Sequence, residues 1–252
     1  PIDDEMKNIF GSLTDAALIH QRGSGTGFSF SRLRPKGDQV GKNKGVASGP
    51  VNFLRVYDAA LDSIKQGGIR AGANMAVLRV DHPDIIRFVE SKRDKRSLKN
   101  FNISVGITDN FMRAVEADRQ YYVINPRDGK NLGLLRARDV FAIITQNAWK
   151  TGDPGLVFID EINRRHPAKH LGGIETTNQC GEAPLLPYEG CVLGSLNLNK
   201  FITEDDIDWD RLKIAVQTAV HFLDNVIDMN SYPKPEIEQQ TKNTRKFGLG
   251  IM

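Results

Sequence analysis

The amino-acid sequence predicts an α/β fold with a largely parallel sheet. The first observation is that helix-type and strand-type segments alternate along the whole chain, a pattern typical of parallel sheets with helical crossovers. The second is an ordinary globular composition, since 40% of the 252 residues are hydrophobic and 26% are charged. The third is that no internal repeat, low-complexity tract or linker divides the chain. We therefore expect residues 1–252 to form a single domain.

The first elements are a helix, a tight turn and a strand. Residues 5–20 place Ile9, Leu13 and Ala16 at helical spacing, and the glycine-rich QRGSGTG ends this helix. FSFS then alternates aromatic and small residues as a strand does. Residues 31–50 form a loop of about twenty residues without apolar periodicity, and such a long loop usually has a function.

The middle of the chain continues the alternation. A helix follows Pro50, which suits a first helical turn, and a short helix after the strand MAVLRV has Asp81 as its candidate cap. The next helix is predicted to start at Thr108 or Asp109. The remaining predicted elements are a strand over 101–107, a hairpin over 121–135 that turns at 126–129, and a helix over 137–152.

The last third begins with the apolar strand GLVFIDEIN, which ends in acidic residues, and residues 164–187 follow without periodicity. A strand over 191–198 and a long helix over 208–230 come next. The final residues, KFGLGIM, resemble the start of a further element. We therefore expect the chain to be an interior piece of a longer protein.

Charge and cysteine content exclude several classes of protein. A net charge of +3 is too small to form a nucleic-acid-binding stripe, and the chain shows neither a signal region nor a membrane span, so we expect a cytoplasmic protein. Cys180 and Cys191 fit neither a disulfide scaffold nor a zinc site. Because Pro167 separates His166 from His170, a loop is favoured over a metal-binding helix, and no metal site is predicted.

Two glycine-rich segments are candidate ligand contacts. GSGTG lacks the GxGxxG spacing of dinucleotide-binding turns, so it is either a tight turn or a close approach of backbone to a ligand. The basic loop downstream favours a phosphate ligand, because Arg and Lys recognise phosphate. QGGIRAGA, around Arg70, is either a helix stop or a loop that reaches a nucleotide.

The densest chemistry lies in TTNQCGEAPLLPYEGC. Cys180 is either a buried inert cysteine or a reactive thiol on a loop. In an extended backbone, Asn178, Cys180 and Glu182 would share one side at intervals of about 7 Å. A thiol, an amide donor and a general base would then face one small substrate. The residues thus predict thiol chemistry on a nucleotide-like ligand.

Several motifs in order resemble one family. RGSGTGFSFSRLRPKGD, KGVASGP, QGGIRAGA, FNISVGITDNFM, TGDPGLVFIDEINRR and NQCGEAPLLPYEGCVLGSLNL look like the adenosylcobalamin-dependent (class II) ribonucleotide reductases over essentially the whole chain. The resemblance implies roughly the first half of a ten-stranded α/β barrel with a central cysteine-bearing loop. It assigns effector-specificity loops to residues 1–80, and the cysteine loop with its following strand to residues 171–198.

The resemblance also implies roles for individual residues. Cys180 would become a thiyl radical that abstracts the 3′ hydrogen of a ribonucleotide, and adenosylcobalamin would be the source of the radical. Glu182 would take the 3′ hydroxyl proton, and Asn178 would hold the sugar. Cys191 would be one half of the dithiol that reduces the 2′ position. The implied substrate-binding residues are Gly25, Asn178, Gln179, Cys180, Gly181 and Glu182.

The implied partners are a ribonucleotide substrate, a deoxynucleoside triphosphate effector, a thioredoxin-like reductant and a second copy of the full-length protein. The implied effector site comprises Asp4, Gln21, Arg34 and Lys44. The loop that relays effector identity to the substrate comprises Gln66, Gly67, Gly68 and Arg70 within residues 66–73. The family usually has proline where this chain has Gln179. The partner of Cys191 would lie outside the chain, and we therefore expect the isolated piece to be inactive.

Two other functions remain open. A nucleotide-sensing regulatory module would keep the basic loops and perform no chemistry. A thiol-disulfide oxidoreductase would use Cys180 and Cys191 as a pair, which requires Cα atoms about 4.4 to 6.8 Å apart.

Overall fold

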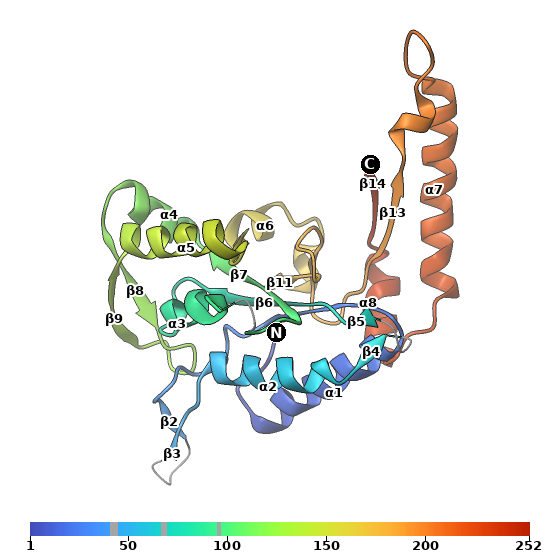
Figure 1. Ribbon diagram of the computed structural model, residues 1–252. Helices are drawn as coiled ribbons and strands as arrows, with labels where there is room; N and C mark the ends of the chain where they lie inside the picture. Colours follow the sequence, from blue (N-terminus) through green and yellow to red (C-terminus); the bar gives the residue numbers. More distant parts are fainter. Residues whose placement is uncertain (41–44, 67–69, 95–96) are drawn as a thin grey trace. The chain divides into compact units, whose positions relative to one another are not determined.

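The computed structural model describes residues 1–40, 45–66, 70–94 and 97–252 (Figure 1). These residues form two compact units, Pro1–Leu186 and Pro187–Met252. A single domain over residues 1–252 stays a prediction. No helix of the described residues is long and apolar enough to cross a membrane.

The first unit is built on a four-stranded parallel sheet with the strand order β1-β6-β7-β10. Its strands are β1 (Thr26–Ser29), β6 (Asn74–Arg79), β7 (Phe101–Ile107) and β10 (Gly155–Phe158). The α/β class with a parallel sheet is therefore confirmed. Strand β10 ends at Phe158, earlier than predicted, because Asp160 and Glu161 stabilise the first turn of the next helix through its dipole.

Helices precede, connect and follow the strands of this sheet. They are α1 (Met6–Gln21), α2 (Pro50–Asp62), α3 (Ile85–Val89), α4 (Asp109–Glu116), α5 (Ala137–Thr151) and α6 (Ile159–Arg165), with the 3-10 helices η1 (Glu90–Lys92) and η2 (Lys169–Leu171). The predicted cap of α4 is confirmed, since the hydroxyl of Thr108 accepts a hydrogen bond from the Phe111 N–H at 3.2 Å. The predicted cap Asp81 is wrong. Its carboxylate accepts hydrogen bonds from Arg79, and α3 begins after Asp84.

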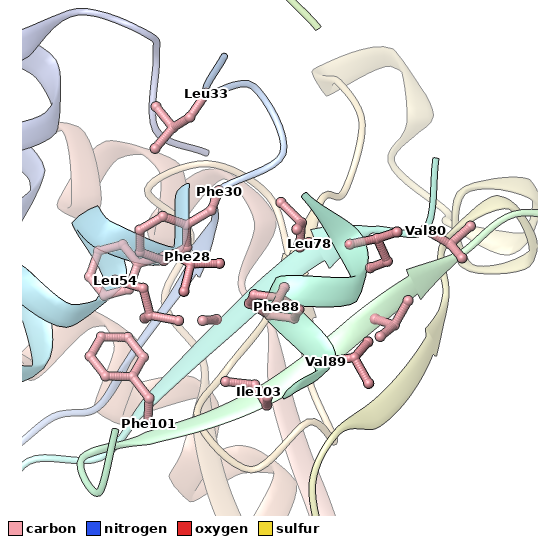
Figure 2. Close-up of a cluster of buried hydrophobic side chains, with 14 of the residues drawn as sticks. Phe28, Phe30, Leu33, Leu54, Leu78, Val80, Phe88, Val89, Phe101 and Ile103 are labelled. Atoms are coloured by element: carbon pink, nitrogen blue, oxygen red, sulfur yellow. The ribbon is translucent and has the colours of Figure 1, made fainter. Parts of the chain in front are cut away.

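One face of the sheet carries the large apolar residues. On β7 these are Phe101, Ile103, Val105 and Ile107, which alternate with smaller or polar residues, as the period of a strand requires. Together with buried side chains of α1 to α5 they form one core cluster. Figure 2 shows part of this cluster, including Phe28, Phe30, Leu54, Leu78 and Phe88. The helices therefore cover this face.

The opposite face carries small and polar residues. On β1 and β7 these are Gly27, Ser29, Asn102, Ser104 and Gly106. This face is covered by a short hairpin of β11 (Thr176–Thr177) and β12 (Pro184–Leu185), whose first strand contacts β1 and β6. A second, smaller apolar cluster lies here and consists of Met75, Val77, Val157, Ile159, Ile174 and Leu186.

Three further antiparallel pairs lie in the loops. They are β2 (Gln39–Val40) with β3 (Gly45–Val46), β4 (Lys65–Gln66) with β5 (Arg70–Ala71), and β8 (Gln120–Ile124) with β9 (Asn131–Arg136). The last pair confirms the predicted hairpin. The first pair shows that residues 31–50, which were expected to be one long loop, contain a short ladder.

The second unit pairs β13 (Val192–Leu196) with β14 (Phe247–Ile251) in parallel and connects them through α7 (Trp209–Met229) and α8 (Pro235–Thr244), after the 3-10 helix η3 (Leu198–Phe201). Helix α7 confirms the predicted long helix, and its cap is Asp208, whose carboxylate accepts from the Arg211 N–H at 2.9 Å. The final residues form strand β14, which confirms the further element that their apolar pattern predicted.

Candidate active site

Cys180 lies in the turn of the β11–β12 hairpin. The two strands are in register at Thr176 with Leu185 and at Thr177 with Pro184, so residues 178–183 form the turn. Cys180 and Glu182 are exposed, whereas Asn178 is buried. The alternative of a buried inert cysteine is therefore wrong within this unit, and the thiol is accessible to a ligand.

Asn178 shapes this turn from inside. Its side-chain Oδ1 accepts hydrogen bonds from the N–H groups of Gly181 at 3.1 Å and Ala183 at 3.0 Å. Gly181 has a φ of 91°, a conformation that favours glycine, and its N–H also approaches the Asn178 carbonyl at 3.2 Å. The expectation that residues 178–182 are extended is wrong, because these bonds close a turn. The three side chains therefore do not follow strand geometry.

The glycines before and within β1 allow the hairpin to pack closely against the sheet. A Cβ atom on Gly27 would lie 1.7 Å from the Thr177 carbonyl oxygen, and one on Gly25 would lie 2.5 Å from the side-chain Oε1 of Gln179. Gly23 has a φ of 88° and forms the tight turn after α1. The tight-turn interpretation of GSGTG therefore applies to Gly23, whereas the backbone at Gly25 and Gly27 approaches the hairpin, and its approach to a ligand stays a prediction.

Asn102 is a further contact that the sequence analysis missed. Its side-chain amide donates to the Gln179 carbonyl at 2.8 Å. The signal was present in FNISVGI, because alternation places Asn102 opposite the large apolar residues that face the helices. Gly25, Asn102 and Gln179 all lie at the amino ends of the parallel strands. The turn with Cys180 is thus held at this end of the sheet.

A cavity of about 400 Å³ lies on the same face at the carboxyl ends of the strands. Its lining includes Ser29, Arg32, Arg79, Asp160 and Glu175. Arg32 pairs with Glu175, and with Asp3 at 2.8 Å, while Arg79 pairs with Asp81 at 2.6 Å. The hydrogen bonding of the Arg79 guanidinium, which donates to the Asp81 carboxylate, is the main cause that raises the pKa of Arg79. The two arginines that line the cavity are therefore paired with carboxylates.

Two of the predicted effector residues lie together. Arg34 Nε donates to Asp4 Oδ2 at 2.6 Å, and the same guanidinium donates to the Gln39 carbonyl at 2.9 Å. Gln21 is the exposed last residue of α1. Lys44 lies outside the described residues.

The predicted relay loop is described only in part. Gln66 and Arg70 are paired in the β4–β5 ladder, and Gly67 and Gly68 lie outside the described residues. Cys191 is half-buried and directly precedes β13 in the second unit. Because Cys180 lies in the first unit, the relation of the two thiols stays a prediction.

Comparison with known proteins gives consistent matches over the whole chain. The family model described as the ribonucleotide reductase barrel domain matches residues 1–252. The vitamin B12-dependent ribonucleoside-diphosphate reductases of Thermoplasma acidophilum and Mycobacterium tuberculosis (strain CDC 1551 / Oshkosh) are 53% and 51% identical over 100% of the chain. A vitamin B12-dependent ribonucleotide reductase of Streptomyces clavuligerus is 34% identical over 99% of it. The chain spans 33%, 37% and 29% of the lengths of these three relatives.

Proposed function

Because the chain belongs to the ribonucleotide reductase family, we propose that the full-length protein reduces ribonucleotides to deoxyribonucleotides for DNA synthesis. The observation that carries the proposal is the exposed Cys180 thiol on a turn held against the sheet by Gly25, Gly27 and Asn102. A reactive thiol needs this combination of access and fixed position. The family's ten-stranded barrel, closed by parts beyond this chain, is part of the same proposal.

In the proposed reaction, the Cys180 thiyl takes the 3′ hydrogen of the substrate and later returns it. Glu182 accepts the 3′ hydroxyl proton, and its exposed carboxylate on the same turn supports this role. Replacing the 2′ hydroxyl by hydrogen consumes two electrons, which a dithiol supplies as it becomes a disulfide and the hydroxyl leaves as water. Cys191 is proposed as one thiol of that pair, and a thioredoxin-like dithiol would reduce the disulfide afterwards.

Asn178 has a second task in this proposal. Its Oδ1 is used within the turn, so a sugar would be held by the amide NH₂ group of the side chain. The amide thus fixes the turn and the substrate together. Because Gly25 has no side chain, the side chain of Gln179 can lie against its backbone. We propose that the Gly25 backbone also contacts the substrate.

The proposed source of the radical is adenosylcobalamin, because the relatives named above are vitamin B12-dependent. A corrin ring with its nucleotide tail requires more space than either of two cavities that described residues line, of about 400 and 530 Å³. The residues that line these two cavities therefore do not fit the cofactor by themselves. Since the chain spans about a third of its relatives, we also propose that the isolated piece is inactive.

A deoxynucleoside triphosphate is the proposed effector, and the Asp4–Arg34 pair beside the β2–β3 ladder supports its placement. We also propose a homodimer of the full-length protein. Helix α1 exposes Met6, Phe10 and Leu18, which would suit an apolar interface with a second copy.

The test uses full-length protein supplied with adenosylcobalamin, a dithiol and a ribonucleoside diphosphate that carries tritium at C3′. We expect Cys180→Ser to abolish both deoxynucleotide formation and tritium release. Cys191→Ser is the matched control, and it should stop dithiol-dependent turnover while hydrogen abstraction continues. Unchanged product formation by Cys180→Ser would overturn the proposal. Equal loss of thiol exchange in both variants, without tritium release in the wild type, would favour the oxidoreductase alternative.

A further inference from the structure

His20 is a fully buried side chain that the proposed chemistry does not use. It lies in the last turn of α1, with a relative exposure of 0%. The backbone of Gly72 lies against its imidazole ring, since a Cβ on Gly72 would be 2.1 Å from His20 Nδ1 and 2.4 Å from Cε1. Only glycine can occupy position 72 while this ring is present.

The hydrogen bonds around the ring fix which nitrogen carries the proton. The Thr26 hydroxyl donates its single proton to Asn74 Oδ1 at 2.5 Å, so toward His20 it can only accept. His20 Nε2 lies 3.4 Å from that hydroxyl oxygen and is therefore the protonated nitrogen. Nδ1 is then an acceptor, and it is buried without a hydrogen-bond partner. Burial lowers the pKa of His20, which keeps the ring neutral.

The same polar chain leads to the amino ends of the strands. Asn74 Nδ2 donates to the Asn100 carbonyl at 2.9 Å, and the Thr26 N–H donates to the Ala73 carbonyl at 3.2 Å. Gly25, one residue before Thr26, adjoins Gln179 of the turn that bears Cys180. His20 thus connects Gly72, at one end of residues 66–73, with the backbone that seats the proposed catalytic turn.

An unsatisfied buried acceptor is unfavourable, so a backbone arrangement that gives it a donor is stabilised. The backbone of Gly72 lies against the ring, and like every residue other than proline it has an N–H that can donate. Because glycine has no Cβ, the backbone of Gly72 can rotate by a small amount that would cause a steric clash at any other residue.

We propose that His20 is a positioning residue that sets the conformation of Gly72 and thereby the strength with which a bound deoxynucleoside triphosphate alters substrate preference. In the effector-bound form, the N–H of Gly72 donates to His20 Nδ1. The proposal rests on the proposed function, because it names a residue that couples the predicted effector loops to the Cys180 turn.

The test measures kcat/KM of the full-length protein for two ribonucleotides, with and without dATP, dTTP or dGTP. His20→Phe keeps a ring but removes both nitrogens. We expect it to reduce the effector-induced change in substrate preference at least about fivefold, while kcat/KM without effector stays within about twofold. His170→Phe, at an exposed position of the same unit, is the matched control and should behave as the wild type.

A second set of variants separates coupling from folding. Gly72→Ala should lower the basal activity and weaken the effector response, because its Cβ clashes with the ring. Adding His20→Ala removes the clashing atoms, so the double variant should regain the basal activity of the wild type but not the effector response. Gly11→Ala, where a Cβ meets nothing within 4 Å, is the glycine control. A wild-type effector response in both His20→Phe and the double variant would overturn the proposal.

A separate readout distinguishes this inference from the proposed function. Hydrogen exchange of a peptide covering residues 70–74 is followed with and without dATP, dTTP or dGTP, and needs no turnover. We expect effector-dependent protection of the Gly72 amide in the wild type and its loss in His20→Phe. Equal protection in both proteins overturns the role of His20, whereas absence of deoxynucleotide formation by the wild type overturns the proposed function.

Discussion

The two faces of the parallel sheet in the first unit differ in what covers them. On the helix-covered face, large side chains such as Phe30, Phe101 and Ile103 are at most 1% exposed and belong to one extensive cluster. On the hairpin-covered face, only Met75, Val77 and Val157 of the sheet join a small apolar cluster. Glycine, serine, asparagine and arginine occupy much of the rest.

The two faces therefore have different roles: one mainly stabilises the fold, and the other holds the groups proposed to take part in chemistry. Apolar burial stabilises a fold in proportion to the area removed from water, so the helix-covered face contributes most of the stability. Small and polar residues on the other face leave room for the hairpin, the cavity and accessible polar groups. The same strands serve both purposes, because successive side chains point to opposite faces.

The largest expected effect is on the helix-covered face. Phe30→Ala removes a fully buried ring that packs against Tyr57 with ring centroids 5.4 Å apart. We expect the free energy of unfolding to fall by about 3 to 5 kcal/mol, measured by urea denaturation of the full-length protein. The hairpin-side counterpart Met75→Ala should cost less, since its cluster is smaller. Equal losses would show that the two faces contribute alike.

An intermediate effect is expected where the hairpin meets the sheet. Gly27→Ala would place a Cβ 1.7 Å from the Thr177 carbonyl, a backbone atom that cannot rotate away. We expect a loss of about 1 to 3 kcal/mol in stability together with a marked loss of the proposed deoxynucleotide formation by the full-length protein. Gly11→Ala, in an open helical position, is the control and should be neutral or stabilising by up to about 1 kcal/mol. Full activity in Gly27→Ala would show that the position of the hairpin is not needed.

The smallest expected effect is a pH dependence that originates beside the helix-covered core. Burial is the main cause that lowers the pKa of His20 and His82 from the usual 6.5. His82 Nε2 lies 2.8 Å from the Leu33 carbonyl, to which it donates, and Nδ1 accepts from the Asp84 N–H at 3.0 Å, so both nitrogens are used by the neutral ring.

Below about pH 6.5 the unfolded chain binds protons that these folded histidines do not bind, so stability is present above that pH and is lost as the pH falls. The slope is at most about 1.4 kcal/mol per pH unit for each histidine. Urea denaturation at several pH values between about 7.5 and 5.5 measures it. His82→Gln should reduce the slope, and exposed His170→Gln should leave it unchanged.

Much of the secondary structure was predictable from the sequence. The alternation of FNISVGI and the cap at Thr108 depend on neighbouring residues, and both predictions are confirmed. The extended conformation expected for residues 178–182 failed, because the Asn178 side chain closes a turn with residues that also suit a strand. Asp81 failed as a cap because Arg79, two residues earlier, competes for its carboxylate.

The sequence by itself determined the parallel α/β class, the family resemblance and the choice of Cys180, because these depend on local periodicity and on motifs of contiguous residues. Only the tertiary structure decided why Gly25 and Gly27 are glycines, how Asn102 holds the turn, and that His20 lies under Gly72. Those contacts join residues from about 50 to 150 positions apart. Local periodicity contains no information about contacts between residues so far apart in the sequence. These contacts form only when the strands align and the hairpin packs on the face of the sheet.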